Sequence, residues 1–456
     1  MSRLLILLLL HASCLLPSAW AKPNVVIFFT DDQGTLDANC YGSSDLYTPA
    51  MDQLAATGIR FTQAYSHVVC CPARALLMTG RHPQRSGVVH WTQGDRHGTD
   101  AGNTNMAAAE VTIAEALKGA GYKTAIFGKW HLGAKEGHGP LAQGFDHHFG
   151  HLGGFIDNYN HFFLHGSGFH DLYEDNKEVF KRDEYFPDLM TKRALDYIEA
   201  NKEGPFFIYV AFNIPHYPEQ PDKKFEERYQ DLKMPRRSYA KMISTTDDRM
   251  LQILKKLEAL DLRKETIVIF MSDNGHSTED GAKIRPNHKS GLPEGHYYHA
   301  NGGGGNTGKF RGNKGTYFEG GLRVPAIISY PAHLPQGVVR DQAITAMDWF
   351  PTVLELCGIE QPAAAPRLDG HSLVPVIRSA EATSAYGGVL YFQWHKKWAV
   401  REDHWKLIGT DGRSDMSLHN LADEKPELTN HAKAQPEIVA RLKKLHEAWA
   451  RDVAPE

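Results

Sequence analysis

The sequence has few cysteines, no dominant charge and only one long apolar run, and each of these absences narrows what it can be. Five cysteines in 456 residues exclude a small disulfide-rich scaffold. Fifty Lys and Arg against 54 Asp and Glu, a formal net charge of −4, provide no basic field of the kind that binds nucleic acid. Beyond the N-terminus, no stretch is apolar for long enough to cross a membrane. We therefore expect no nucleic-acid partner and no membrane span.

The one apolar run lies at the N-terminus and predicts a signal peptide over residues 1–21. Arg3 supplies the positive start, Leu4–Leu10 is the apolar segment, and "AWA", ending at Ala21, is a small-x-small cleavage site. A retained anchor is the competing interpretation, but the run is short for a membrane span. We therefore expect an exported protein, periplasmic or secreted, that is cleaved near Ala21.

The remaining chain is long enough for a large domain with an appended subdomain. Short apolar strands alternate with amphipathic helices, which is typical of a mostly parallel sheet covered on both faces. After Pro366–Gly370 the pattern changes to four short strand-like runs joined by polar turns, with a helix near 435–450. We predict an α/β fold: a large doubly wound sheet flanked by helices over 22–368, and a small antiparallel sheet with a helix over 369–456.

Oxygen-bearing side chains directly follow two of the predicted strands. Asp31 and Asp32 end "NVVIFFTDD", and Asp273 and Asn274 follow "TIVIFMS". Ligands bind outside the carboxyl ends of strands in open α/β sheets, so these side chains are expected to meet. Converging carboxylates repel one another without a cation, and oxygen ligands favour calcium or magnesium over zinc. Either pair alone is more often a turn or cap, but the two pairs together predict a metal site.

Two adjacent cysteines stand at the start of a predicted helix. "CCPARALLMTG" has the pattern of a helix entered at Pro72 and ended by Gly80, with Cys70 and Cys71 at its N-terminus. The backbone N–H groups and helix dipole at that end favour an anion and would lower the pKa of a thiol. Arg74, one turn into the helix, would point to the same place. A nucleophile beside an anion site is modestly favoured over a structural cysteine.

Basic side chains follow further apolar segments. Lys129 and His131 lie in "GKWHLG", His216 lies in "FNIPHYP", and Lys314 lies in a glycine-bracketed turn. Any one of these is more often a surface lysine or a histidine with structural hydrogen bonds. Their repeated position just past apolar strands predicts a single cationic pocket. The Gly- and His-rich stretch His296–Gly312 predicts a long loop beside it.

In combination, these fragments resemble the formylglycine-dependent sulfatases of the alkaline phosphatase superfamily. The similarity extends from "NVVIFFTDDQG" through "CCPARALLMTGR", "GKWHLG", "PHYP", "SDNG" and "KGTYFEGGLRVP" to "LDGHSL", in this order and over most of the chain. The family motif C-x-P-x-R fits Cys70, Pro72 and Arg74, and it leaves Cys71 at a variable place. Ala73 stands where serine is most common. The resemblance implies an alkaline-phosphatase-like fold.

The resemblance also implies a sulfuric ester hydrolase with a sulfo-enzyme intermediate. An export-coupled maturation enzyme would oxidise Cys70 to formylglycine (3-oxoalanine), whose hydrate attacks the sulfur. The metal would be calcium rather than magnesium. Its ligands would be Cys70 in its oxidised form and the four oxygen-bearing side chains at the strand ends, Asp31, Asp32, Asp273 and Asn274. Charge on the sulfate would be neutralised by Arg74, Lys129 and Lys314. His216 with Lys314 would assist the departing alcohol, and His131 would take the proton that releases sulfate.

Two other functions remain open at this point. Phosphodiesterases and phosphonate monoester hydrolases of the same superfamily act on esters of the same tetrahedral geometry. An inactive exported protein that only binds sulfated glycan is the other alternative, although no expected catalytic position is missing. Export favours a sulfated carbohydrate as the substrate. Several loop aromatics would either line a groove for sugar rings or simply pack the loops, namely Trp91, Tyr159, Phe162, Tyr297 and Tyr298.

Overall fold

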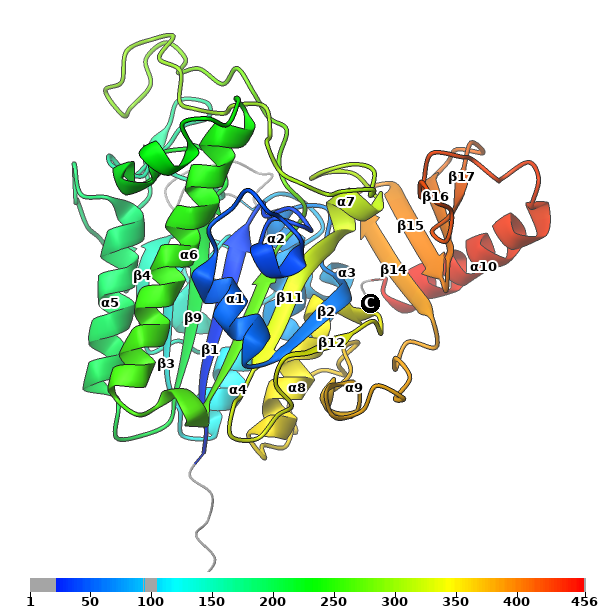
Figure 1. The fold of residues 1–456 in the computed structure, drawn as a ribbon, viewed down its shortest axis with the longest axis horizontal. Coiled ribbons are helices and arrows are strands. Elements are labelled where there is room, and N and C mark those ends of the chain that lie inside the picture. The colour runs from blue at the N-terminus through cyan, green and yellow to red at the C-terminus, as the bar shows by residue number, and fades with distance from the viewer. Residues whose placement is uncertain (1–21, 93, 95–104, 455–456) are drawn as a thin grey trace, which may run out of the picture.

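The protein consists of a large sheet with helices on both faces and a smaller sheet attached at one end (Figure 1). The structure is a computed structural model, and it describes residues 22–92, 94 and 105–454. The signal peptide predicted over residues 1–21 lies outside the described residues. No helix in the described part of the chain combines the length and the apolar character that crossing a bilayer requires.

The main sheet has 11 strands, and its centre is parallel. Five adjacent parallel strands form this centre, in the order β10 (Thr266–Ser272), β1 (Asn24–Asp31), β9 (Phe206–Pro215), β3 (Lys123–Lys129) and β4 (His147–His151). Beyond β4 the sheet continues with β7 (Tyr173–Glu174) and β8 (Lys177–Glu178). Beyond β10 it continues with β11 (Arg323–Ser329), β2 (Ile59–Tyr65), β12 (Val338–Arg340) and β13 (Ile344–Thr345). The doubly wound, mostly parallel fold predicted from the sequence is confirmed.

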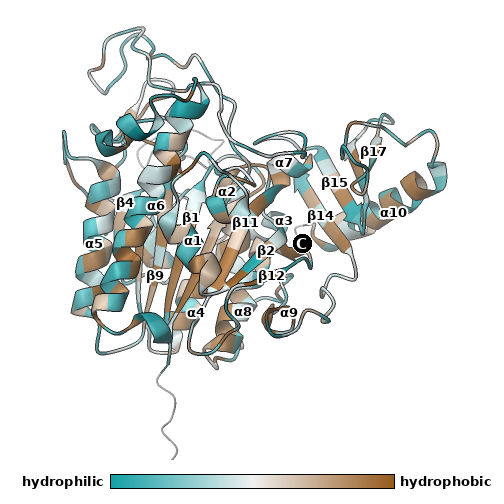
Figure 2. Ribbon diagram, viewed as in Figure 1, coloured by the Kyte–Doolittle hydropathy of each residue, from teal (hydrophilic) through white to brown (hydrophobic). Residues whose placement is uncertain are grey.

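The central strands are buried on both faces because each face carries its own layer of helices. Alternate side chains of β1 enter different cores, Ile27 on one face and Phe28 on the other. The core around Ile27 includes α2 (Cys70–Thr79), α4 (Ile113–Gly119), α8 (Trp349–Leu356) and α9 (Val374–Arg378). The core around Phe28 includes α1 (Pro49–Ala56), α5 (Phe186–Ala200) and α6 (Arg236–Ala259). Figure 2 shows hydrophobic strands enclosed by helices whose outer surfaces are hydrophilic.

Local sequence signals start and stop these helices. Pro49 is the first residue of α1, where its missing N–H costs nothing. Thr112 and Glu115 form a reciprocal capping box at the start of α4. Gly80 ends α2 with φ 65°, a left-handed conformation that glycine adopts without strain. Residues at the helix ends therefore determine where these helices begin and end.

Strand β11 was not predicted from the sequence, and it runs antiparallel to both of its neighbours. Pro325 lies inside it, at the point where its register with β2 shifts between Val324 and Ala326. Because proline has no N–H to donate, it is tolerated in a sheet mainly at such irregularities. Because of this proline, the sequence pattern did not indicate a strand here. The antiparallel strand makes the sheet mixed on this side.

The C-terminal part forms a four-stranded antiparallel sheet with one helix, as predicted. Its strands are β14 (Val389–Trp394), β15 (Lys397–Glu402), β16 (Trp405–Thr410) and β17 (Ser417–Asn420), and α10 (Pro436–Asp452) packs against them. The other face contacts the main domain through Tyr65, Tyr317 and Phe392. Ile377 of α9 belongs to the main core, and the domain boundary near Pro366–Gly370 stays a prediction.

Buried ion pairs and hydrogen bonds join this C-terminal part to the residues just before and just after Lys314. The Lys406 ammonium lies 2.9 Å from a carboxylate oxygen of Glu319 and 2.5 Å from one of Glu427. Glu427 also accepts the backbone N–H of Glu319 at 2.7 Å, and its carbonyl accepts from Arg311 at 3.0 Å. Arg311 and Glu319 flank the turn that holds Lys314, so the C-terminal sheet fixes the position of that turn.

Candidate active site

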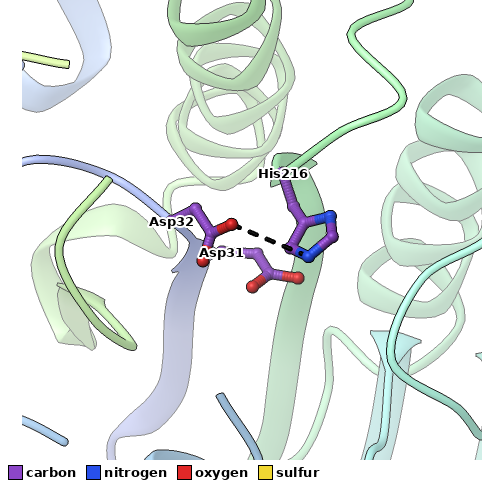
Figure 3. A group of neighbouring side chains, drawn as sticks. All are labelled: Asp31, Asp32 and His216. Atoms are coloured by element: carbon purple, nitrogen blue, oxygen red, sulfur yellow. Dashed lines mark ion pairs between the residues drawn. The ribbon is translucent and has the colours of Figure 1, made fainter. Parts of the chain in front are cut away.

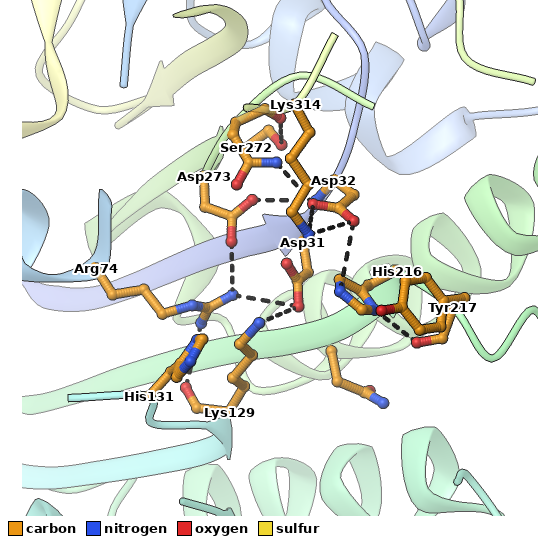
Figure 4. A network of polar contacts seen from close by, with 12 residues as sticks. Asp31, Asp32, Arg74, Lys129, His131, His216, Tyr217, Ser272, Asp273 and Lys314 are labelled. Carbon is orange, nitrogen blue, oxygen red and sulfur yellow. Dashed lines mark hydrogen bonds and ion pairs between the residues drawn. The ribbon is translucent and has the colours of Figure 1, made fainter. Parts of the chain in front are cut away.

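The predicted polar side chains converge at one edge of the parallel sheet (Figure 4). Asp31 ends β1 and Lys129 ends β3, while His216 and Asp273 directly follow β9 and β10. These four strands are neighbours, so their carboxyl ends bring the four side chains together. All four side chains are buried. The convergence expected from strand ends is therefore present in the structure.

Three carboxylates and one amide form the acidic part of the site. Asp31, Asp32, Asp273 and Asn274 are at most 1% exposed. The Asp32 backbone N–H donates to Asp273 Oδ1 at 3.0 Å, and the Asn274 amide donates to Asp32 Oδ1 at 2.7 Å. Asp32 has φ 67°, a conformation that is rare for residues other than glycine. Strain of this kind is typical of functional sites.

Each carboxylate faces a cation from another part of the chain. Lys129 Nζ donates to Asp31 at 2.6 Å, and Lys314 Nζ lies 2.8 Å from Asp32. Arg74 of α2 lies 3.1 Å from Asp273. Three carboxyl groups thus face three cations. A bound divalent cation would add positive charge to the site and favour the binding of an anion.

The pKa shifts in this cluster follow from burial and charge. Burial raises the pKa of Asp31, but the positive charges around it, Lys129 first and then Arg74 and Lys314, together hold that pKa below its usual range. Burial and then the charge of Asp31 raise the pKa of Asp273 well above its usual value. Burial lowers the pKa of Lys314, yet its negative neighbours, Asp32 first and Asp31 with it, together raise it overall. The Asp31–Asp273 pair therefore resists full ionisation until a further positive charge is nearby.

The donor set fits a hard divalent cation. Asp31 Oδ1 and Asn274 Oδ1 are buried, and neither has a hydrogen-bond partner among the described residues. Ligand atoms of Asp31, Asp273 and Cys70 all lie within 4.8 Å of one another. Such unsatisfied oxygen atoms are costly unless something coordinates them. A second group of the same compactness joins Asp31 and Asp32 to His216, a nitrogen donor that the sequence analysis did not propose as a ligand (Figure 3).

Cys70 lies at the N-terminus of α2, at the base of the pocket described below. Its side chain is 1% exposed, and its Sγ occupies the place of the oxygens that an oxidised and hydrated residue 70 would carry. The expectation of a lowered thiol pKa was wrong, because burial raises the pKa of Cys70. Cys71 is buried in the hydrophobic core instead. Every cysteine in the described residues is a free thiol, including Cys40 and Cys357.

Hydrogen bonds to carbonyl oxygens define the tautomers of both site histidines. His131 Nε2 lies 3.1 Å from the Thr92 carbonyl, so Nε2 carries the proton and Nδ1, which has no described partner, is a bare acceptor. His216 Nδ1 lies 2.6 Å from the Tyr217 carbonyl, which leaves its Nε2 as the acceptor. Burial lowers the pKa of His216 to about 4 and that of His131 well below 6.5. Both rings are neutral at pH 7.

A pocket of about 580 Å³ opens onto these groups. Cys70, Lys314, His131 and His216 lie in its lining. Of the aromatic residues proposed from the sequence, only Trp91 is in the described lining, and it stacks 6.3 Å from the His131 ring. The others contact protein groups, with Tyr159 on Tyr185, Phe162 on His170, Tyr297 on Asn301 and Tyr298 on Tyr217.

Other aromatic side chains in the pocket wall were missed. Phe155, Phe163 and Tyr217 line it, and the Phe155 ring lies 5.2 Å from that of His216. Tyr217 could have been inferred, because it directly follows His216 in the sequence. The sequence analysis singled out neither Phe155, which lies outside the helices and strands, nor Phe163, which lies in the two-residue strand β5 (Phe162–Phe163).

Comparisons with known proteins agree with this geometry. The profile of the family described as Sulfatase matches residues 23–359, and the profile described as N-sulphoglucosamine sulphohydrolase, C-terminal, matches residues 305–451. N-acetylgalactosamine-6-sulfatase of Homo sapiens is 32% identical over 88% of this chain and 77% of that protein. Arylsulfatase D of Homo sapiens is 30% identical over 86% of this chain and 76% of that protein. The solved structure of Ps i-CgsB in complex with k-i-k-neocarrahexaose has a TM-score of 0.77 at 26% identity and covers 94% of this chain and 93% of that one.

Proposed function

Because this chain belongs to the sulfatase family and is a hydrolase of sulfate esters, we propose that its substrate is a sulfated carbohydrate and that residue 70 acts as a formylglycine. The observation that carries the proposal is the position of Cys70, buried at the base of a pocket within 4.8 Å of carboxylate oxygens of Asp31 and Asp273. The cations of the site surround the same place. This arrangement suits a nucleophile that attacks an anionic ester.

Asp31, Asp32, Asp273 and Asn274 would hold a divalent metal together with residue 70. Their oxygen atoms favour calcium, with magnesium second, because calcium accepts a larger and less regular set of oxygen ligands. A bound divalent ion supplies positive charge next to the sulfate oxygens. Asp31 Oδ1 and Asn274 Oδ1, the two buried oxygens without partners, support this assignment.

A maturation enzyme encountered during export would convert Cys70 to formylglycine. The sequence "CCPAR" supplies the motif at Cys70, Pro72 and Arg74. The hydrate of this aldehyde would supply two hydroxyls on residue 70, one to act as the nucleophile and one to lose the proton when sulfate leaves. A buried thiol with a raised pKa is a poor nucleophile by comparison. The structure thus gives a physical reason why the cysteine itself would not serve.

Three cations of the chain would bind and orient the sulfate group. Arg74, Lys129 and Lys314 reach the site from α2, β3 and the turn before α7 (Glu319–Leu322). Their existing bonds to Asp31, Asp32 and Asp273 hold the charges in place before substrate arrives. Such preorganised charge stabilises the negative charge that shifts toward the departing oxygen as the S–O bond breaks.

The two histidines would handle protons differently. His131 lines the pocket that holds residue 70 and has an unprotonated Nδ1 without a described partner, so it would accept a proton from that residue. His216, in its neutral tautomer, has no proton on Nε2. Lys314 is the charged donor beside it, and it would therefore protonate the departing alcohol oxygen, with His216 positioning the group.

The pocket lining supports a carbohydrate substrate. Trp91, Phe155 and Tyr217 offer apolar ring faces of the kind on which sugar rings stack, next to the polar base of the pocket. The names of similar proteins also favour a carbohydrate. One relative is named N-acetylgalactosamine-6-sulfatase, and one similar structure contains a bound neocarrahexaose. Export of the chain after cleavage near Ala21 would deliver it to extracellular polysaccharide.

Sulfate release by purified protein tests this proposal. The protein would be expressed together with a formylglycine-generating enzyme, supplied with calcium, and assayed on nitrophenyl sulfate, bis-nitrophenyl phosphate and a panel of sulfated oligosaccharides. We expect sulfate release from at least one sugar and little phosphate diester hydrolysis. Faster phosphate hydrolysis would identify a phosphodiesterase instead. Binding of sulfated sugars without any release, by protein whose residue 70 is converted, would identify a binding protein.

A further inference from the structure

One wall of the active-site pocket carries an acidic side chain, which is unexpected in a site that attracts an anion. Glu279 lines the same pocket as Cys70 and Lys314, and among the described residues of that lining it is the only carboxylate. It makes no contact with the cations of the site, and its side chain is 44% exposed. A negative charge at this place opposes the binding of sulfate, so it needs another explanation.

Glu279 is held by the aromatic wall of the pocket. Its Oε1 lies 3.6 Å from His165 Nε2, and the Tyr217 hydroxyl lies 3.4 Å from the same nitrogen. The Phe155 ring packs 4.8 Å from the rings of both His165 and Tyr217. Burial raises the pKa of Glu279, but the neighbouring polar groups of His165 and Tyr217 outweigh it and lower that pKa to about 2. The carboxylate is therefore ionised throughout the neutral pH range.

We infer that Glu279 selects the substrate: it accepts hydrogen bonds from the free hydroxyls of a sugar that carries one sulfate ester, and it repels a sugar that carries a second anionic group. This inference deepens the proposed function and rests on it. The base and the wall of the pocket then have separate roles. The base binds the sulfate group to be removed, and the wall at Glu279 recognises the other substituents of the sugar ring.

The chemistry of a carboxylate supports both parts of this role. Its two oxygens accept hydrogen bonds from adjacent hydroxyls, and adjacent hydroxyls are what an unsubstituted sugar ring presents. Ser277 and Thr278 lie beside Glu279 in the lining and add two hydroxyl groups of their own. A second sulfate or a carboxylate on the same ring would meet a like charge in a partly desolvated pocket. At this exposure, such repulsion lowers binding by about tenfold.

Paired substrates test the inference directly. Monosulfated hexoses and N-acetylhexosamines would each be compared with the same sugar bearing a second sulfate, as kcat/KM or, for sugars that are not turned over, as the inhibition constant against nitrophenyl sulfate. For the wild type we expect a preference for the monosulfated member of about tenfold. Glu279→Gln keeps the shape and removes the charge, so it should reduce this preference to about twofold by improving the disulfated sugar.

A matched control separates charge in the pocket from charge nearby. Glu294→Gln makes the same chemical change in the same long segment, at an exposed position outside the described pocket lining, and it should leave the preference at its wild-type value. Equal affinity of the wild type for both sugars, or an unchanged preference in Glu279→Gln, would overturn this inference alone. A wild-type protein that releases sulfate from no ester would overturn the proposed function and this inference with it.

Discussion

Lys129 donates a 2.6 Å hydrogen bond to Asp31, and both side chains are completely buried. They end strands β3 and β1, which are separated in the sheet by β9. The bond therefore spans three strands at the edge where the site is built. Burying such a pair is favourable only when its geometry is good and each partner is kept. The positions of the Lys129 and Asp31 charges in the site therefore depend on how β3, β9 and β1 are arranged in the sheet.

Loss of Lys129 should disable catalysis more than it disables folding. Lys129→Met keeps most of the packed side chain but removes one of the charges that would bind the sulfate oxygens, and we expect kcat for nitrophenyl sulfate to fall by at least about 100-fold. Lys123→Met is the control, because Lys123 begins the same strand and is exposed. Thermal unfolding of both variants shows whether the fold persists. A near-normal kcat in Lys129→Met would remove this residue from the site.

The adjacent cysteines should differ sharply in function although both are buried. Cys70→Ala should abolish turnover, since it removes the residue to be converted, whereas Cys71→Ala should keep most of the activity and lose about 1 kcal/mol of stability from the core. Mass spectrometry of the peptide that contains both residues would locate the modification. Equal inactivation by the two substitutions would show that the reactive position is wrongly assigned.

The sequence predicted the parts of the site that depend on strand ends. Asp31, Lys129, His216 and Asp273 each follow an apolar strand, and neighbouring parallel strands bring such positions together. The predicted thiol pKa was wrong because burial of Cys70, which no local pattern reports, raises that pKa. Glu279, Phe155 and Phe163 were missed for a related reason. Phe155 and Glu279 lie outside the helices and strands, and Phe163 lies in a strand of only two residues, so neither periodicity nor capping signals reveal them.

Removal of Asp273 should release the metal. Asp273→Ala deletes one of the converging carboxylates and leaves Arg74 without its 3.1 Å partner, so calcium retained after gel filtration should fall to background. Chelation should lower the melting temperature of the wild type, because a ligand that binds only the folded state stabilises it, and should change that of Asp273→Ala little. Asp231→Ala, at an exposed position, should behave like the wild type. Unchanged calcium content in Asp273→Ala would exclude it as a ligand.

Two histidines at the joint with the C-terminal sheet, His67 buried and His82 partly buried, should make that joint sensitive to acid. His67 contacts the Gln393 carbonyl at 3.2 Å, and the His82 ring lies 5.0 Å from Trp449 of α10. Burial lowers the pKa of His67 to about 3 and that of His82 to about 4. The unfolded chain, with histidine pKa near 6.5, therefore binds more protons than the folded one below that pH. Stability from these groups is complete above pH 6.5 and is lost as the pH falls toward 4.

Replacing one of these histidines should flatten the dependence of stability on pH. His67→Gln keeps a polar side chain but cannot take up a proton, so between pH 7 and pH 4 its unfolding free energy in urea should fall by on the order of 3 kcal/mol less than that of the wild type. His404→Gln, at an exposed position, should follow the wild type. If His67→Gln and the wild type lose stability in parallel, then His67 is protonated in the folded protein, and acid must act on the joint through other groups.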